Sequence, residues 1–556
     1  MKLRKLLQFG APFAALFAGG VPASAQPSSG QQETDRADAG MIERDAAAPA
    51  APNAAPSARA APAPDGPPPE LAGEIMVGAV VIDGARAMRP AQFAPVFAPF
   101  VGRRLGAADL KALAQAVADL ARAQGYVFAS AWVPRQTVES GVLRVRLDEG
   151  AIGDVRISGA DNIAIGRTLA VLADARPVTK STLERALLLA GDLPGVRVAD
   201  TRYLREGDRG ILLVEASERR SAGSVQVDNW GSRAVGPIRV RVRADLNGAF
   251  LAGDQLSLRS TVTPLQPREL ATVGFDYAID TGFDGLLAGF GASFASVEPG
   301  RQSRLVEIDG RSVSFNANLS YPLLRRREAN VWTTADFTVR DVEQERADAL
   351  IRNDRLSTVT LGVSGYRELG GGWLYGRLSA RQGLGLFDST RRGDPLASRF
   401  NGSARFSKLD VYADWTGPLS GPLSLRVAGE AQVASRALLS SEEMGLGGPR
   451  FGRAYDYNER SGDRGVAGLA ELRYDLKSFP KAIRSTQLYL FADAGSIGNS
   501  GRGGRGGNLY SAGGGVLFDL SRVFDAGAEI AFPLAHDRYE TGDRHPRLSF
   551  TLSARF

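Results

Sequence analysis

The 556-residue chain contains no cysteine, which excludes disulfide bonds, thiolate metal sites, iron–sulfur clusters and cysteine nucleophiles. It has only two histidines, His536 and His545, so a histidine-based metal centre or catalytic triad would have to use one of them. Both flank a short charged segment, which is more typical of an exposed loop or turn than of a metal site. We therefore expect no metal, no cofactor and no enzymatic activity.

The net charge is small, and long apolar runs are scarce. The net charge is +6, and removing the three basic residues of an N-terminal leader lowers it to +3, which gives no reason to expect a nucleic-acid partner. Beyond the leader we find no run of about 18 apolar residues, so no second helix is expected to span the inner membrane.

The leader itself, residues 1–25, has the pattern of a secretory signal peptide. A basic start precedes an apolar stretch at 6–18, and small residues at 23–25 form a cleavage site. An N-terminal anchor helix is the alternative, but the apolar stretch is short and is interrupted by Pro12. The expected destination is the periplasm or beyond.

Low-complexity sequence follows the leader. Residues 49–72 are rich in alanine and proline and are expected to form an extended, flexible linker. Residues 26–48 are polar and are compatible with one short helix, which would be marginal in water, or with a disordered segment. Composition alone favours disorder.

Two tandem α/β modules are predicted at 73–150 and 151–218. Each has the order strand, helix, helix, strand, strand, and the repeat of this order defines the architecture of the region. In the first module Leu110, Leu113 and Val117 recur at helical spacing.

From residue 219 to 556 the helical pattern is replaced by alternating segments of about nine to twelve residues. Val313, Phe315 and Leu319 share one face of such a segment, whereas Asn316 lies on the other. This alternation is typical of a transmembrane β-barrel strand. The length of the region fits about 16 antiparallel strands, and 14 or 18 are also compatible.

The last ten residues, RLSFTLSARF, place Leu548, Phe550 and Leu552 on one face and end on Phe556. A soluble β-protein gains nothing from a final strand that ends flush on an aromatic residue. A membrane barrel needs such a strand, because no open edge can remain in lipid. The predicted fold class is therefore mainly β, with a C-terminal transmembrane barrel after two α/β modules.

Two motifs suggest chemistry that their surroundings do not support. The Gly-rich stretch 501–506 matches GxGxxG, but an alternating segment follows it instead of the helix that a dinucleotide site requires, so a barrel loop is favoured. Glu442 and Glu443 resemble an acid–base pair, yet nothing nearby would separate their pKa values.

A stronger signal joins two distant segments. Residues 445–465 form a long loop rich in glycine and arginine that contains Arg453, and a later strand carries Asp493. An aspartate at membrane depth is costly unless it faces the lumen and has a partner. Arg453 folded into the pore would pair with it, and ordinary solvated loop charges are the alternative.

At these residues the chain resembles the two-partner secretion transporters, the TpsB or ShlB/FhaC/HecB family of haemolysin secretion and activation proteins. Residues 125–150 resemble its first POTRA module and 184–198 its second, so 73–150 and 151–218 would be POTRA 1 and POTRA 2. Asp38-Ala39-Gly40 resembles the start of the family's plug helix, which would place that helix in 26–48.

The resemblance extends to the loop. The family's Val-Arg-Gly-Tyr/Phe tetrad corresponds here to Gly-Arg-Ala-Tyr at 452–455, which departs at the first and third positions. The family's Phe-x-Asp-x-Gly strand motif is matched at 491–495. The resemblance implies a reentrant-loop lock formed by Arg453, Tyr455 and Asp493 inside the barrel. It also implies the supporting residues Gly452, Gly462, Asp463, Arg464, Phe491 and Gly495.

The implied function is export of an unfolded, haemolysin- or adhesin-like exoprotein through an outer-membrane barrel without ATP. The POTRA modules would recognise this TpsA-like passenger in the periplasm, and the further partners would be outer-membrane lipid and the barrel-assembly machinery. The main alternative is an outer-membrane protein insertase or assembly factor of the same superfamily. A diffusion porin would not need the tandem modules, and a lipid-modifying enzyme would need a nucleophile–base pair.

Overall fold

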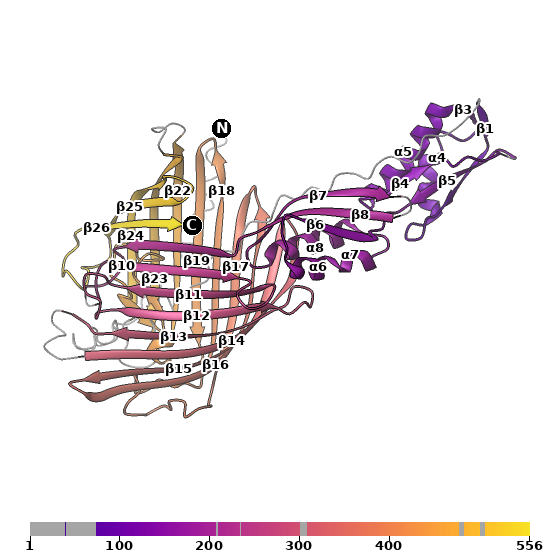
Figure 1. Ribbon diagram of the computed structural model, residues 1–556. Helices are drawn as coiled ribbons and strands as arrows, with labels where there is room; N and C mark the ends of the chain where they lie inside the picture. Colours follow the sequence, from indigo (N-terminus) through magenta and orange to yellow (C-terminus); the bar gives the residue numbers. More distant parts are fainter. Residues whose placement is uncertain are drawn as a thin grey trace.

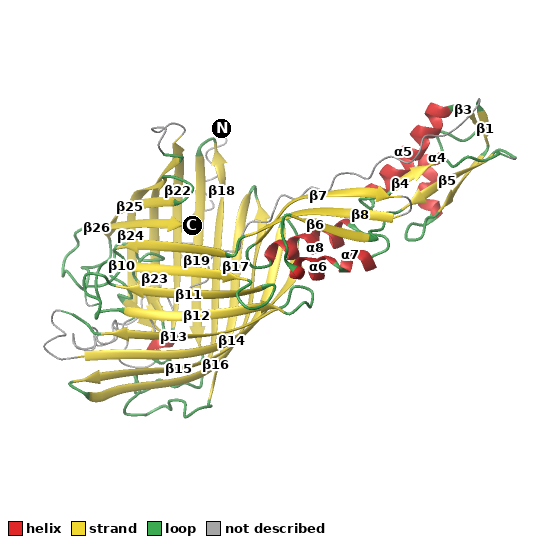
Figure 2. Cartoon of the chain, viewed as in Figure 1, coloured by secondary structure: helices red, strands yellow, loops and turns green. Residues whose placement is uncertain are grey.

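The computed structural model describes Ala39 and residues 74–556, except 139, 207–208, 234, 301–307, 477–482 and 501–505. The expected signal peptide and the Ala/Pro-rich linker lie outside the described residues. Of the expected plug segment only Ala39 is described, and of the GxGxxG stretch only Gly506. Figure 1 shows two small modules that extend from one end of a large barrel, and Figure 2 shows that the longer helices lie in the modules.

The first module packs helix α5 against a three-stranded sheet of order β2-β5-β4, in which β2 runs parallel and β4 antiparallel to β5. Leu110, Leu113 and Val117 of α5 are fully buried, as their spacing predicts. Its elements are β1 (Ile75–Val77), β2 (Ala79–Asp83), η1 (Pro90–Phe93), α4 (Ala94–Phe97), β3 (Arg103–Leu105), α5 (Ala107–Ala123), β4 (Ser130–Trp132) and β5 (Val142–Asp148).

The second module repeats this topology, with a sheet of order β6-β8-β7 in which β6 is parallel and β7 antiparallel to β8. The side chains of Asn162 and Thr179 cap the first turns of α6 and α8. No helix among the described residues is long and apolar enough to cross a membrane. The elements are β6 (Asp154–Ser158), α6 (Ile163–Leu169), α7 (Val171–Asp174), α8 (Lys180–Asp192), β7 (Val196–Glu206) and β8 (Arg209–Glu218).

The barrel is closed, antiparallel and made of consecutive neighbours, and the predicted fold class is confirmed. Its sixteen strands are β9 (Ser221–Asp228), β10 (Arg239–Asn247), β11 (Asp254–Val262), β12 (Ala271–Asp280), β13 (Leu287–Val297), β14 (Ile308–Arg325), β15 (Ala329–Arg346), β16 (Ala349–Leu369), β17 (Gly372–Leu384), β18 (Ser407–Ser420), β19 (Leu423–Ala434), β22 (Arg464–Leu476), β23 (Ser485–Gly498), β24 (Gly507–Asp519), β25 (Phe524–Pro533) and β26 (Arg547–Arg555). The expected strand length is wrong for β14, β15 and β16, which have 18, 18 and 21 residues.

Side chains alternate between the two faces of the barrel wall as predicted. On β14, Val313, Phe315 and Leu319 are exposed, Phe315 by 60%, whereas Ser312 and Ser314 on either side of Val313 are buried. The outer face is thus apolar and the inner face polar, which is the pattern of a barrel in lipid.

Strand β26 pairs with β9 and closes the barrel. Phe556 and Gly223 exchange two main-chain hydrogen bonds, with the Phe556 N–H donating at 3.0 Å and the Gly223 N–H at 2.8 Å. The ladder ends at the Thr551–Asp228 pair. Beyond it, the Asn229 side chain donates to the Leu548 carbonyl at 2.9 Å and so continues the seam.

Ion pairs fasten the second module to the barrel end from which it emerges. Arg325 at the end of β14 contacts both carboxylate oxygens of Asp192 on α8 at 2.6 Å. Arg185 of α8 contacts Asp284, in the turn between β12 and β13, at 2.8 Å. Partial burial raises the pKa of Asp284, but hydrogen bonds from Arg185 and Tyr321 outweigh it and hold that pKa below its usual value.

Candidate functional site

The connection between β19 and β22 does not stay at the mouth of the barrel but folds back between its walls. It contains η3 (Ser440–Glu442) and a two-stranded sheet of β20 (Met444–Leu446) and β21 (Arg460–Gly462). At Gly452 the backbone has φ +76°, and an added Cβ would lie 3.1 Å from the main-chain nitrogen of Gly447. Both features require glycine at this turn, which we call the tip of the reentrant loop.

Asp493 holds the tip by its main chain. It lies on the inner face of β23 with 5% exposure, and its carboxylate accepts the N–H groups of Gly452 at 3.0 Å and Arg453 at 3.2 Å. The Ser511 hydroxyl on β24 also donates to it. The expected pairing of the Arg453 guanidinium with Asp493 is therefore wrong in its atoms, because Asp493 accepts the backbone N–H of Arg453 and the guanidinium donates to other carboxylates.

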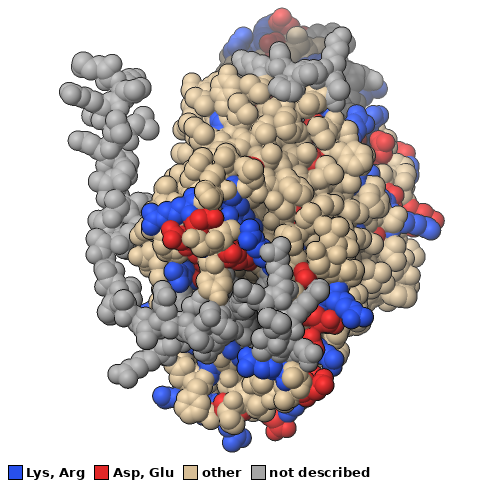
Figure 3. Space-filling model, turned by 90° about the vertical axis from the view of Figure 1, so that its left-hand side faces the viewer, with Lys and Arg blue, Asp and Glu red and all other residues tan. Residues whose placement is uncertain are grey.

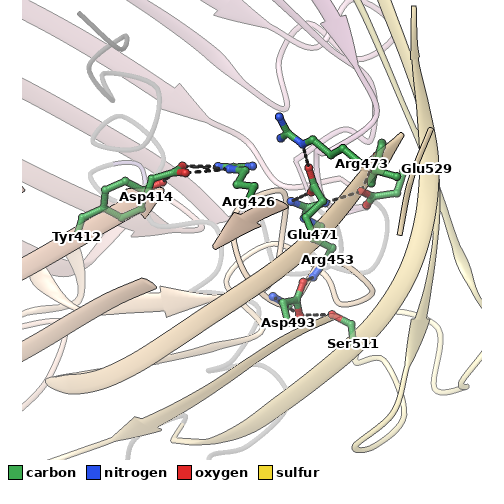
Figure 4. A network of polar contacts seen from close by, with 11 residues as sticks. Tyr412, Asp414, Arg426, Arg453, Glu471, Arg473, Asp493, Ser511 and Glu529 are labelled. Carbon is green, nitrogen blue, oxygen red and sulfur yellow. Dashed lines mark hydrogen bonds and ion pairs between the residues drawn. The ribbon is translucent and has the colours of Figure 1, made fainter. Parts of the chain in front are cut away.

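The guanidinium of Arg453 instead points to two other inward-facing carboxylates (Figure 4). It donates to Glu471 on β22 and to Glu529 on β25, both at 2.9 Å, and its carbon lies 4.5 Å from the centre of the Phe491 ring. Arg473 contacts Glu471 at 2.6 Å from the other side. A buried cation shared between two carboxylates and an aromatic face is a strong anchor.

Glu471 and Glu529 were missed by the sequence reasoning. Each is an acidic residue on an alternating strand, between neighbours that face outward, which is the same signal that identified Asp493. We call Arg453, Glu471, Phe491, Asp493 and Glu529 the tip cluster.

Tyr455 lies beside the tip cluster rather than in it. Its side chain is fully buried, and its hydroxyl accepts the N–H of Ala535 at 2.9 Å. Its ring lies 5.2 Å from that of His536, and its carbonyl accepts a 2.6 Å hydrogen bond from Arg547 at the start of β26. Tyr455 thus connects the reentrant loop to the last loop and to the closing strand.

The supporting glycines allow close approach between the loop and the wall. At Gly495 on β23 an added Cβ would lie 2.6 Å from the Leu446 side chain of β20. At Gly462 on β21 it would lie 2.7 Å from the carbonyl oxygen of Gly498. Both positions therefore favour glycine for packing against β23.

Asp463 anchors the other end of the loop. It is fully buried and contacts Arg399 at 2.6 Å, and it also accepts the N–H groups of Leu438 at 2.7 Å and Ser500 at 2.6 Å. Arg464 does not join it, since that side chain begins β22 on the exposed face.

Glu442 and Glu443 complete this anchor. Glu442 contacts Arg381 on β17 at 2.8 Å and Lys408 on β18 at 2.9 Å. Glu443 contacts Arg399 at 2.5 Å. The two glutamates, which the sequence analysis considered as an acid–base pair, are buried ion-pair partners. We call the six residues the base cluster: Arg381, Arg399, Lys408, Glu442, Glu443 and Asp463.

The loop is therefore held at its tip by β22, β23 and β25 and at its base by β17 and β18. Figure 3 shows that basic and acidic side chains gather around a hollow in one face of the barrel. Because the buried charges are paired, removing one partner would leave an uncompensated charge, a change that costs about 3–5 kcal/mol in buried pairs.

One residue of the N-terminal segment also lies against this loop. Ala39 is helical and 1% exposed, and it packs in one apolar cluster with Tyr457 of the reentrant loop. The other members are Val235, Leu270, Ala295 and Val297.

A closed antiparallel barrel with an apolar outer face, a loop folded inside it and two α/β modules at one end defines an outer-membrane β-barrel with appended domains. Residues 207–518 match the model of the haemolysin secretion/activation protein ShlB/FhaC/HecB family, and residues 75–150 match the ShlB-type POTRA domain. The chain belongs to this family of outer-membrane transporters, as its resemblance predicts.

Curated relatives and solved structures agree with this assignment. The chain is 22% identical over 471 residues to the heme/hemopexin transporter protein HuxB of Haemophilus influenzae, covering 82% of each chain. It is 23% identical over 487 residues to the outer membrane transporter CdiB of Escherichia coli, covering 82% of this chain and 79% of CdiB. The solved E. coli CdiB structure has the same fold, with a TM-score of 0.70 at 19% identity, covering 96% of this chain and all of CdiB.

Proposed function

We propose that this chain is the outer-membrane transporter of a two-partner secretion system and exports an unfolded exoprotein through its barrel. The observation that carries the proposal is the reentrant loop, which two clusters of buried ion pairs hold inside the barrel. Such a loop obstructs the lumen at rest and has to move before a polypeptide can pass. A pore for free diffusion would gain nothing from it.

The two modules are proposed to lie in the periplasm and to receive the passenger there. Each three-stranded sheet leaves edge strands, β2 and β4 in the first module and β6 and β7 in the second. An extended segment added to such an edge is bound mainly through main-chain hydrogen bonds, which tolerate many sequences. This form of recognition suits a passenger that arrives unfolded.

Export is proposed to proceed without ATP and without any chemical reaction by the transporter. Folding of the passenger outside the cell would bias its movement outward. The residues of the tip and base clusters serve to hold the loop. The proposed partners are the passenger, the lipid around the barrel and the barrel-assembly machinery that inserts it.

The N-terminal segment 26–48 is proposed to be a helix that occupies the lumen beside the reentrant loop. The position of Ala39 supports this proposal, because it is helical and buried against Tyr457 of that loop. The Ala/Pro-rich residues 49–72 would then connect the lumen to the first module, as an extended chain of about 3.1 Å per residue can.

Deleting the gene tests this function against that of an insertase. A dedicated transporter leaves a single exoprotein inside the cell, whereas loss of an insertase lowers the levels of many outer-membrane proteins. One observation favours the insertase alternative. The fold is similar to that of BamA from Haemophilus ducreyi lacking POTRA domains 1–3, with a TM-score of 0.53 at 12% identity. A general loss of outer-membrane proteins would refute the transporter proposal.

A further inference from the structure

A cavity of 530 Å³ lies next to the tip cluster. Arg453, Glu471 and Glu529 line one side of it. Asp475 and Asp519 line the other side, at the ends of β22 and β24 from which the modules also emerge. We call this cavity the chamber. A polypeptide that comes from the modules would enter it before it reaches the reentrant loop.

The chamber wall carries more carboxylates than guanidinium groups. Five carboxylates and three guanidinium groups line it, and each guanidinium already contacts a carboxylate. The carboxylates are Glu471, Asp475, Asp519, Asp525 and Glu529, and the guanidinium groups are those of Arg426, Arg453 and Arg473.

Three acceptor atoms in the chamber wall have no hydrogen-bond partner among the described residues. They are Oε1 of Glu529, Oδ1 of Asp519 and Oγ of Ser549. Ser549 is 5% exposed, so its hydroxyl is buried as well as unpartnered. Buried polar atoms without partners are costly, and a ligand that supplies donors would remove that cost.

We propose that the chamber binds an extended segment of the passenger that carries basic side chains. This inference rests on the proposed function and deepens it, since it assigns a binding site and a ligand chemistry within the transport path. Ion-pair partners outside the lining reduce the charge difference, because Arg484 contacts Asp519 at 3.5 Å, Arg555 contacts Asp525 at 3.0 Å and Arg426 contacts Asp414 at 2.7 Å. With these partners included, one carboxylate remains in excess, which favours a cationic ligand over a neutral or acidic one. The volume lies within the range of about 300–1,000 Å³ that is usual for ligand sites.

Occupation of the chamber would also act on the tip cluster through Glu529. Its Oε2 accepts the Arg453 guanidinium at 2.9 Å and the Tyr489 hydroxyl at 2.8 Å, while Oε1 is unpartnered. A cation bound at Oε1 shares the negative charge that holds Arg453 and repels its guanidinium. The ligand therefore weakens the anchor of the loop from the side on which the passenger arrives, which couples binding to release of the tip.

The absence of cysteine allows a direct test on the full chain in proteoliposomes. Ser553→Cys introduces a single thiol at a half-buried position of the chamber wall, and Ser420→Cys makes the same change at an exposed position at the end of β18. We expect a cationic methanethiosulfonate reagent to modify the Ser553→Cys variant at least ten times faster than an anionic one. Ser420→Cys should show no such preference.

Peptide protection then identifies the ligand chemistry. Acetyl-Gly-Lys-Gly-Lys-amide should slow modification of the Ser553→Cys variant, whereas acetyl-Gly-Glu-Gly-Glu-amide should not. Equal rates with both reagents, or equal protection by both peptides, would overturn the proposal. If Ser553→Cys does not insert, Ser485→Cys in the same chamber replaces it.

The result can be separated from the proposed function by measuring export in cells. If the intact chain exports an exoprotein but the basic peptide gives no selective protection of the chamber thiol, the proposed cation-binding chamber is wrong and the proposed transport function is retained. Selective protection with no exoprotein dependent on this chain supports a cation-binding chamber and overturns the proposed function.

Discussion

Replacing Arg453 by methionine removes the charge from the tip cluster while keeping most of the length of the side chain. The substitution does not touch the main-chain hydrogen bonds to Asp493, because Asp493 contacts the backbone and not the guanidinium, so these two bonds alone have to hold the tip. It leaves Glu471 and Glu529 without their shared cation. We therefore expect the tip to leave its site while the barrel still inserts and resists SDS.

The expected loss of docking free energy follows from the burial of the three charged groups. The Arg453, Glu471 and Glu529 side chains are 7%, 3% and 8% exposed, so the solvent screens their interaction little. Removing one partner of such a group costs about 3–5 kcal/mol. At about 1.4 kcal/mol per tenfold change, docking of the tip should weaken by roughly two to three and a half orders of magnitude.

Ion conductance across planar bilayers reports the resting position of the loop, and passenger in the medium reports export. We expect Arg453→Met to raise the conductance and to reduce export strongly. Arg464→Met is a matched control, since it makes the same change at an exposed position on β22 and should behave as the unaltered protein.

A second substitution that partly restores docking of the loop tests whether the unpaired carboxylate causes the effect. Glu471 keeps its contact with Arg473 at 2.6 Å, so Glu529 is the carboxylate that Arg453→Met leaves without a cation. Adding Glu529→Gln removes that charge, and the double variant should hold the loop better than Arg453→Met alone. Unchanged conductance in Arg453→Met, or an equal change in Arg464→Met, would refute the reasoning.

The base cluster, the module contact and the N-terminal segment each give a further prediction. Glu442→Gln should raise conductance because it removes the carboxylate that Arg381 and Lys408 share, and the double variant with Lys408→Met should return part of the way, as measured in the same bilayers. The pKa of Asp284 is lowered in the folded protein, so its contact with Arg185 is complete above the usual pKa of 3.8 and is lost as the pH falls through the lowered pKa of the folded protein. Distances between spin labels on α8 and the barrel should lengthen at that lower pH, but should not change with pH in Asp284→Asn. Deleting 26–48 should raise conductance without preventing insertion, and unchanged conductance would contradict a place for this segment in the lumen.

The sequence predicts the barrel well because the alternation of its strands has a period of two residues, which is visible without any partner strand. The lengths of β15 and β16 were not predictable in this way. Their hairpin contains the polar stretch around 342–353, which reads as a loop although both strands continue through it. Regular pairing there depends on the neighbouring strand and not on an apolar face.

The candidate site was predictable as a set of residues but not as a set of bonds. The motifs predict that Arg453 and Asp493 lie at one place, and in the structure the Arg453 N–H donates to the Asp493 carboxylate. They cannot show that Asp493 binds the backbone, because that depends on the turn at Gly452, where two N–H groups point the same way. The guanidinium can therefore reach Glu471 and Glu529. These two residues could not be selected from the sequence, because the barrel strands carry many other charged residues.

A loop held by charges suits a transporter better than one held by apolar contacts. When an apolar anchor leaves its site, the exposed surface remains unfavourable in a water-filled lumen and can bind an unfolded passenger without selectivity. When the tip cluster opens, water solvates Arg453, Glu471 and Glu529 and offsets part of the lost attraction. The ion pairs therefore fix one geometry of the docked loop, and the undocked loop is not prohibitively high in free energy. The unpartnered oxygen of Glu529 in the chamber gives an arriving cation a means of shifting the balance between them.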